Sequence, residues 1–316
     1  MNINLFNPSI ASGNTGDQII IDSVKRELQS IFKEGFIFDL PTQEIIGRLS
    51  VKYSKDSKYS YLGGTNILSS NMLRYKQWNI NFTDSFLLKN IILLGVGWWQ
   101  YQDNPDFYTK FILKNVLEKK FNHSVRDGYT EDKLNSIGMF NVLNTGCPTM
   151  WRLTDYHCKE IPVSKGDDVV FTLTDYNKSE KYDISFINIL LKYYRNIYFW
   201  PQGSGDLDYF RSLSVKNINV ISPNLNAYDE VLSSNQSLDY VGTRLHGGVR
   251  ALQKRRRSLI LTIDNRAHEI ALNTRLPVVA RSNREQIENW IISSASTSIK
   301  MPWSNIELWK NQFLDS

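Results

Sequence analysis

Long apolar runs and paired cysteines are scarce in this sequence. The most apolar stretch, 86–99, is interrupted by Lys89 and Asn90 and is shorter than the ~20 residues that a membrane-spanning helix needs. The two cysteines, Cys147 and Cys158, have no paired spacing, which argues against a disulfide framework and favours a reducing compartment. The amino terminus also lacks the basic and apolar pattern of a signal peptide. These absences predict a soluble, cytoplasmic protein.

Motifs of several large enzyme classes are also missing. There is no Gly-x-Ser-x-Gly elbow and no Gly-x4-Gly-Lys-Ser/Thr phosphate loop, so serine hydrolases and P-loop NTPases lose their main support. None of the four histidines, His123, His157, His246 and His268, has a cysteine or carboxylate at a recognisable zinc spacing. We therefore predict no metal and no cofactor.

The charge balance is mildly basic, with 37 lysines and arginines against 32 acidic residues. The net charge is +5, and a single run of basic residues accounts for four of these charges: Lys254, Arg255, Arg256 and Arg257. The run is typical of a solvated helix end. The alternative is peripheral contact with the inner face of a membrane, helped by Trp98 and Trp99 if they point outward. Because no recognised nucleic-acid-binding module is present, we expect an anionic partner other than nucleic acid.

Short β-rich apolar runs alternate with segments of helical period, which is typical of an α/β protein. In the first half, Ile21, Val24, Leu28 and Phe32 recur at helical spacing, and a second helix fits 107–117. The predicted strands of this half are 3–6, 36–40, 59–62, 91–96, 124–126 and 142–145.

The second half repeats the pattern, after a polar stretch at 164–168 that we interpret as a linker. One helix covers 184–194, with Ile187, Leu190 and Leu191 as its apolar face. The predicted strands are 169–173, 197–200, 218–221, 240–241, 259–263 and 278–280. Parallel strands joined by helices predict two Rossmann-like domains facing across a cleft. The predicted boundaries are 1–163 for the first domain, 164–290 for the second and 291–316 for a helical tail.

Ligands of such sheets bind at the carboxyl ends of the strands, so residues that follow strands are the candidates. In the first such loop Gly16 permits a close approach beside Asn14, and Asp17 either caps the next helix or offers a carboxylate to a sugar hydroxyl. After 59–62, Gly64 and Asn66 belong either to a ligand-facing loop or to a plain turn.

Later loops add the charged candidates. Arg126 can bind a carboxylate or phosphate with two N–H groups, or can form a surface ion pair with Asp127. Arg244 and His246 flank one apolar residue where a strand meets a helix start, so both can face a single anion; a surface arginine and a capping histidine are the alternative. Asp206 fits an Asp-x-Asp metal motif, but it is better explained as the acidic first turn of a helix.

The order of these motifs resembles that of the polysaccharide pyruvyl transferases, from about residue 10 to residue 281. The motifs that carry the resemblance are Asn14-Thr15-Gly16-Asp17, Leu62-Gly63-Gly64-Thr65-Asn66, Val125-Arg126-Asp127, Gly146-Cys147-Pro148-Thr149, Gly242-Thr243-Arg244-Leu245-His246 and Asp264-Asn265-Arg266. The Arg-Leu-His element is the most diagnostic of them.

The resemblance implies a fold like that of the GT-B glycosyltransferases. It also implies transfer of pyruvate from phosphoenolpyruvate to a sugar of a cell-surface glycan, such as a capsule or exopolysaccharide, usually as a cyclic ketal. Whether the acceptor is lipid-linked stays open. Carried over by motif, the residues that bind phosphoenolpyruvate are Arg244, Leu245, His246 and, from the other domain, Arg126. The acceptor side would include Asn14, Gly16, Asp17, Gly64 and Asn66.

The chemistry of these residues suits that donor. Phosphoenolpyruvate carries a carboxylate and a phosphate, which two arginines and a helix amino terminus can bind. His246 is the first candidate for the general acid or the phosphate partner, and Asp17 for the base. A nucleotide-sugar glycosyltransferase of GT-B fold, helped by Asp206 or Glu269, is the alternative enzyme, and a non-catalytic glycan- or anion-binding protein is the alternative of another class.

Overall fold

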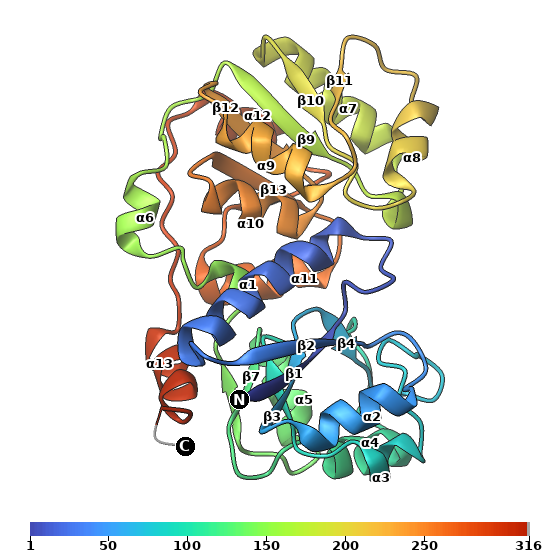
Figure 1. Cartoon of the computed structure of the whole chain (residues 1–316). Coiled ribbons are helices and arrows are strands. Elements are labelled where there is room, and N and C mark those ends of the chain that lie inside the picture. The colour runs from blue at the N-terminus through green and yellow to red at the C-terminus, as the bar shows by residue number, and fades with distance from the viewer. Residues whose placement is uncertain (315–316) are drawn as a thin grey trace. The chain divides into compact units, whose positions relative to one another are not determined.

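A computed structural model describes residues 1–314, except for the side chains of 265 and 266, and its alternating helices and strands confirm the α/β class (Figure 1). The chain divides into two compact units. The first unit comprises Met1–Ser12, Ile20–Pro148 and Met301–Ser316, and the second comprises Gly13–Ile19 and Thr149–Lys300.

The first unit is built on a parallel sheet whose strand order is β2-β1-β3-β5. Its strands are β1 (Asn2–Asn7), β2 (Phe36–Pro41), β3 (Tyr59–Gly63) and β5 (Ile91–Leu94). In its register Leu5 pairs with Tyr61, and Tyr61 pairs with Ile92. The Gly95 N–H donates to Ser124 O at 2.9 Å and so attaches a second ladder, β7 (His123–Val125) with β8 (Val142–Asn144). A short ladder of β4 (Asn66–Leu68) and β6 (Gly97–Trp98) lies at the carboxyl end.

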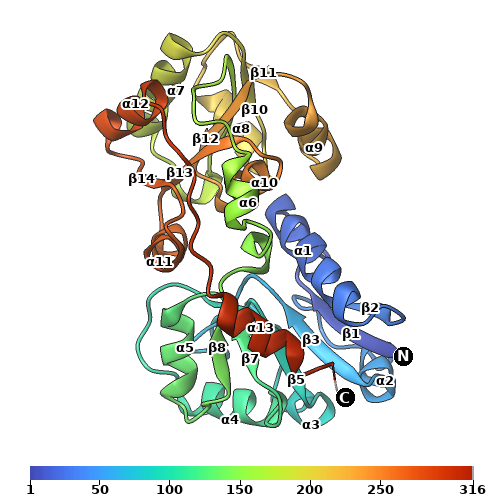
Figure 2. The ribbon, with the colours of Figure 1, turned by 90° about the vertical axis from the view of Figure 1, so that its left-hand side faces the viewer.

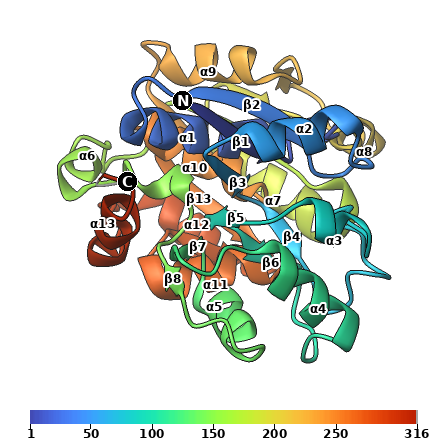
Figure 3. The ribbon, with the colours of Figure 1, turned by 60° about the horizontal axis from the view of Figure 1, so that its bottom comes forward.

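Helices cover both faces of this sheet because its strands are apolar on both sides (Figure 3). One face holds α4 (Phe107–Val116) and α5 (Gly128–Asn135), whose buried Ile112 and Leu134 share a core with Phe6 of β1. Helices α2 (Arg48–Asp56) and α3 (Asp84–Leu87) complete the unit near this core. The other face holds α13 (Trp303–Asn311), since Trp309 packs edge-on against Tyr61.

Helix α1 (Thr15–Ile31) has the amphipathic pattern that the sequence predicts. Ile21, Val24, Leu28 and Phe32 are all buried, and Phe32 contacts the rings of Tyr59 and Tyr61. Its first turn is part of the second unit, while the rest of the helix packs in the first unit.

The second unit is built on one parallel sheet in the order β11-β10-β9-β12-β13-β14. Numbered within the unit, this order is 3-2-1-4-5-6, that of a Rossmann fold. The strands are β9 (Asp168–Thr172), β10 (Ile197–Phe199), β11 (Asn219–Val220), β12 (Leu238–Gly242), β13 (Arg257–Thr262) and β14 (Val278–Ala280). The order reverses between β9 and β12, so their carboxyl ends flank the topological switch point.

Both faces of this second sheet are also covered (Figure 2). On one face, α7 (Glu180–Tyr193), α8 (Asp206–Ser212) and α12 (Arg284–Ile292) share a core with Phe171 and Phe199. On the other face lie α9 (Leu225–Ser233) and α10 (Leu245–Gln253), where Tyr228 of α9 stacks on Trp200 with ring centroids 3.8 Å apart. The unit also contains α6 (Asp155–Lys159) and α11 (Asn265–Thr274).

Some predicted features differ from the structure. The stretch 164–168 is not a linker: Gly166 packs against the backbone of Leu238, and Asp168 begins β9 inside the second unit. The chain passes between the units at Pro148–Thr149 and again at Lys300–Met301, so the predicted tail divides and α13 packs in the first unit. Leu191 is exposed, because the apolar residues on the buried side of α7 are Phe186, Ile187, Ile189 and Leu190.

Candidate functional site

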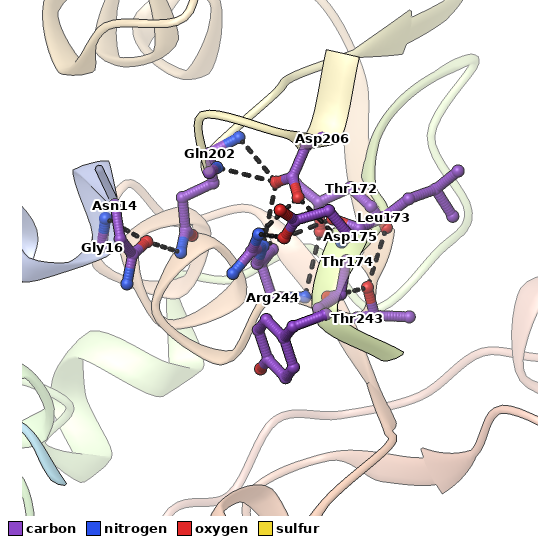
Figure 4. A network of polar contacts seen from close by, with 12 residues as sticks. Asn14, Gly16, Thr172, Leu173, Thr174, Asp175, Gln202, Asp206, Thr243 and Arg244 are labelled. Atoms are coloured by element: carbon purple, nitrogen blue, oxygen red, sulfur yellow. Dashed lines mark hydrogen bonds and ion pairs between the residues drawn. The ribbon is translucent and has the colours of Figure 1, made fainter. Parts of the chain in front are cut away.

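Arg244 lies at the switch point of the second sheet, directly before α10 (Figure 4). Its side chain is buried, and its guanidinium contacts two carboxylates. Nε donates to Asp206 Oδ2 at 2.9 Å and to Leu173 O at 3.3 Å. Nη2 donates to Asp175 Oδ1 at 3.0 Å and also to Asp206. Within the described residues Nη1 forms no hydrogen bond, so its two N–H groups remain for a ligand.

Two glycines make room for this ion-pair cluster. A Cβ on Gly203 would overlap Nη2 of Arg244, and a Cβ on Gly205 would overlap Oδ2 of Asp175. Any larger residue at either position would therefore displace one of the charged groups. This explains why Gly203-Ser204-Gly205 precedes α8.

Asp206 begins α8, as predicted for an acidic first turn, and its side chain is fully buried. Besides Arg244 it accepts hydrogen bonds from the backbone N–H groups of Gly203 at 2.7 Å and Asp175 at 3.1 Å. Burial raises the pKa of the Asp206 carboxyl, and Arg244 and these N–H groups oppose the rise. The carboxylate thus joins the loops after β9 and β10 to Arg244.

Threonine and tyrosine hydroxyls fix the start of α10. Thr172 Oγ1 accepts the Arg244 backbone N–H at 3.1 Å and is hydrogen-bonded to Tyr240 Oη at 2.7 Å. Tyr240 Oη in turn donates to Arg244 O at 2.8 Å. Thr174 and Thr243 join the two strand ends through a 2.7 Å hydrogen bond.

Gln202 connects the amino-terminal motif to this cluster. Its Nε2 donates to Asn14 Oδ1 at 2.9 Å, and its backbone O accepts the Thr15 N–H at 2.9 Å (Figure 4). The space beside Gly16 is filled by the same amide, since a Cβ there would meet Gln202 Cδ at 3.2 Å. Gln202 Oε1 is buried without a hydrogen-bond partner among the described residues and faces Gly247 of α10. Asn14 and the start of α10 therefore lie on either side of one glutamine.

The amino-terminal motif differs in two ways from its prediction. Asn14 Oδ1 accepts the Gly16 N–H at 3.0 Å, so Asn14 holds the start of α1 and Asp17 lies inside its first turn. Asp17 is buried. Asn14, Gly16 and Asp17 belong to the same unit as Arg244, whereas the sequence placed them in the other domain.

Leu245 and His246 begin α10, and both side chains are buried. Arg244 is the N-cap residue of this helix, and its side chain makes no capping hydrogen bond. The N–H groups at a helix start, together with the helix dipole, favour a bound anion.

The candidates in the first unit form a separate group. Arg126 is buried, and its Nε pairs with Asp127 Oδ2 at 3.1 Å, so the ion pair is buried rather than on the surface. A Cβ on Gly97 would overlap Arg126 Nε and lie 2.7 Å from Asn66 Oδ1. Asn66 Oδ1 has no hydrogen-bond partner among the described residues. Gly64, in contrast, is explained by packing, because a Cβ there would overlap Ile20 of α1.

The basic run, which we interpreted as a solvated helix end with membrane contact as the alternative, is held largely by groups of the protein. Arg257 and Trp98 are buried, so neither can contact a bilayer. The four basic side chains bind groups of the protein: Lys254 pairs with Asp229, Arg255 with Glu160, Arg256 with the carbonyl of Leu232, and Arg257 with Asp239. No helix in the described part of the chain is long and apolar enough to cross a membrane.

Sequence reasoning missed Thr172, Thr174, Asp175 and Gln202. Each follows β9 or β10 directly or ends the strand, so its place at the carboxyl edge was the available signal. The side chains of Asn265 and Arg266, part of the family resemblance, lie outside the described residues. Among those described, no cluster of three or more histidine, cysteine or acidic side chains could hold a metal ion.

Two solved structures resemble the chain over nearly its whole length. None of the curated proteins matches the sequence. The UDP-GlcNAc 2-epimerase of Neisseria meningitidis, solved with UDP-GlcNAc, is 12% identical with a TM-score of 0.50, over 100% of this chain and 99% of that chain. Arabidopsis thaliana UGT89C1, solved with UDP-L-rhamnose, is 10% identical with a TM-score of 0.48, over 99% of this chain and 97% of that chain.

The fold is thus GT-B-like, with two Rossmann-like units. Residues 14–265, which include Asn14, Arg126, Arg244 and His246, match the family described as polysaccharide pyruvyl transferase. Because this match spans most of the chain, the protein belongs to the polysaccharide pyruvyl transferase family.

Proposed function

We propose that the protein transfers the pyruvyl group of phosphoenolpyruvate to a sugar of a cell-surface glycan, with phosphate release and closure of a cyclic ketal. The observation that carries this proposal is the family match over residues 14–265. It is supported by the geometry of the second unit, where the start of α10 lies at the switch point of a Rossmann sheet.

The donor would bind at the start of α10. The backbone N–H groups of this first turn and His246 would hold the phosphate, and Nη1 of Arg244 would add one charged hydrogen bond. The carboxylates of Asp175 and Asp206 already accept hydrogen bonds from Nε and Nη2 of Arg244. Arg244 would therefore not bind phosphoenolpyruvate through these two nitrogens together. Its second role would be to hold the helix start in place.

In the proposed reaction a general acid protonates the methylene carbon of phosphoenolpyruvate. The adjacent carbon becomes cationic and is attacked by a sugar hydroxyl, whose proton is taken by a base. Phosphate then leaves, and a neighbouring hydroxyl adds to the same carbon with loss of its proton, which closes the ketal. His246 is the candidate acid or phosphate partner and Asp17 the candidate base, and both are buried residues of the second unit.

Arg126 is proposed as a further anion-binding residue in the first unit. Its Nε is used by Asp127, and no other hydrogen bond of its guanidinium is formed with described residues of that unit. Asn66 Oδ1 and the Arg126 side chain both lie against Gly97, and Asn66 remains the candidate for binding a sugar hydroxyl. Gly64 is no longer needed as a ligand contact, since the close approach of Ile20 accounts for it.

The test is incubation of the protein with phosphoenolpyruvate and a panel of synthetic and lipid-linked glycosides. Mass spectrometry would follow the glycan, and a phosphate assay would follow the donor. We expect one pyruvyl ketal per phosphate released. His246→Ala and Asp17→Ala should each lower turnover by about 10²–10⁴-fold. Near wild-type turnover in either folded variant would remove that residue from the mechanism.

A ligand-dependent thermal shift separates this function from its alternative. Phosphoenolpyruvate should raise the melting temperature of the protein, because a ligand that binds only the folded state stabilises it. A shift with a sugar nucleotide, and none with phosphoenolpyruvate, would contradict the proposal and favour a nucleotide-sugar glycosyltransferase.

A further inference from the structure

A cavity in the first unit opens at the amino ends of β3 and β5, the edge of the sheet opposite to Asn66. Its volume is about 380 Å³. Three lysines line it: Lys55 in the last turn of α2, Lys58 before β3, and Lys89 before β5. We call it the lysine pocket. Serines and the start of each strand form the rest of its polar wall.

The charge of the lysine pocket is not neutralised by the protein. No carboxylate lines it, and Asp56 is the one acidic residue in the two segments, 54–60 and 86–90, that build it. Among the described residues none of the three lysines forms an ion pair, although Lys58 lies over the Tyr59 ring at 5.5 Å. Three ammonium groups around one cavity favour an anionic ligand.

Exposed apolar side chains border the same cavity. Phe86 and Leu87 of α3 line it and are 53% and 43% exposed. Phe82, 51% exposed, packs edge-on against Phe86 with ring centroids 5.2 Å apart and stacks on Phe111 at 5.1 Å. These contacts fix the aromatic side chains in place while leaving about half of each accessible. A free phosphate would use the lysines but would gain nothing from this apolar border.

We propose that the lysine pocket binds the anionic head group of a membrane lipid, with Phe82, Phe86 and Leu87 against its hydrocarbon. Lysines beside exposed aromatic and aliphatic side chains are the combination that holds a protein at the interface of an anionic bilayer. The inference concerns the first unit alone and does not depend on the reaction proposed above. The lysine pocket is also a different surface from the basic run at 254–257, whose side chains pair with groups of the second unit.

The test is co-sedimentation of the full chain with vesicles of phosphatidylcholine alone or of phosphatidylcholine with phosphatidylglycerol. We expect binding to the anionic vesicles only. A variant with Lys55→Gln, Lys58→Gln and Lys89→Gln should bind them about 100-fold more weakly, because each lysine near an anionic surface contributes about 1 kcal/mol, or about fivefold.

The matched control replaces three exposed lysines of the second unit, with Lys178→Gln, Lys181→Gln and Lys216→Gln, and removes the same charge. It should bind within about threefold of the wild type, allowing for the loss of net charge alone. Equal losses in the two variants, or equal binding to neutral and anionic vesicles, would overturn the proposal.

A second variant separates a lipid from a free anion. Phe86→Ser with Leu87→Ser keeps all three lysines and should bind anionic vesicles at least about tenfold more weakly, since it removes two apolar side chains from the bilayer contact. Wild-type vesicle binding by this variant, with a thermal shift by inorganic phosphate that requires the three lysines, would overturn the lipid assignment.

Discussion

Replacing Asp206 with alanine tests whether the buried ion pair holds the second unit together. The carboxylate is inaccessible to solvent and accepts hydrogen bonds from Arg244 and from the N–H groups of Gln202, Gly203 and Asp175. Its removal leaves a buried guanidinium and several buried donors with fewer acceptors. Breaking a buried ion pair costs about 3–5 kcal/mol. Because Asp175 still pairs with Arg244 at 3.0 Å, we expect the lower end, about 3 kcal/mol.

The measurement is equilibrium denaturation in urea, followed by circular dichroism. Asp208→Ala is the matched control, since Asp208 lies in the same first turn of α8 but is exposed, and it should change the free energy of unfolding by less than about 0.5 kcal/mol. Asp175→Ala should cost about 1 kcal/mol, because the Asp175 side chain is 32% exposed and water can replace it. Equal unfolding free energies for Asp206→Ala and Asp208→Ala would refute the reasoning.

A double variant, Asp206→Leu with Arg244→Met, probes the same pair from the other side. If the cost of Asp206→Ala comes from an unpaired buried charge, removing both charges should be less destabilising than the sum of the single changes. Additive effects in such a cycle would instead point to packing alone.

Three further predictions concern the first unit. Burial lowers the pKa of His123 from 6.5 to about 4, so between these pH values the unfolded chain binds more protons than the folded chain. The free energy of unfolding should therefore fall by about 3 kcal/mol from pH 7 to pH 4. Denaturation at a series of pH values should show this fall in the wild type, and His123→Gln should not show it. Gly64→Ala should destabilise by about 2–4 kcal/mol in urea, since Gly64 has φ +57° and no space for a Cβ, whereas Gly128→Ala should be neutral. Phe313→Ala should cost about 3 kcal/mol of unfolding free energy by removing a buried ring. Leu314→Ala should cost little, because Leu314 is 64% exposed, and similar values for the two variants would contradict the packing of the segment after α13.

The local pattern of the sequence predicted most elements because they depend on nearby residues. The helix carrying Ile21 and Val24 and the strand at 278–280 are found where periodicity and β propensity placed them. The same reasoning placed Leu191 on a buried face, because a helical period does not say which of two adjacent apolar stripes meets the sheet.

Contacts between distant segments were beyond prediction. Gln202 binds Asn14 across 188 positions, and no local signal records that pairing. The polar stretch at 164–168 has the composition of a linker, but Gly166 is held there by a close backbone approach that composition does not report. For Arg244, the sequence indicated an anion-binding residue, but the two carboxylates that occupy it come from loops whose meeting depends on the sheet order.

Neither unit is a continuous piece of the chain, and this bears on how the protein is made. The first unit receives α13 from residues that leave the ribosome after the whole second unit, and the second unit receives Gly13–Ile19 from residues that leave it before most of the first unit. Synthesis at about 5–20 residues per second therefore separates Tyr61 of β3 from Trp309 of α13 by on the order of 12–50 seconds. During that interval the ring of Tyr61 has no Trp309 or Phe313 to pack against. Tyr61 therefore gains its packing against α13 only after the whole second unit has been synthesised.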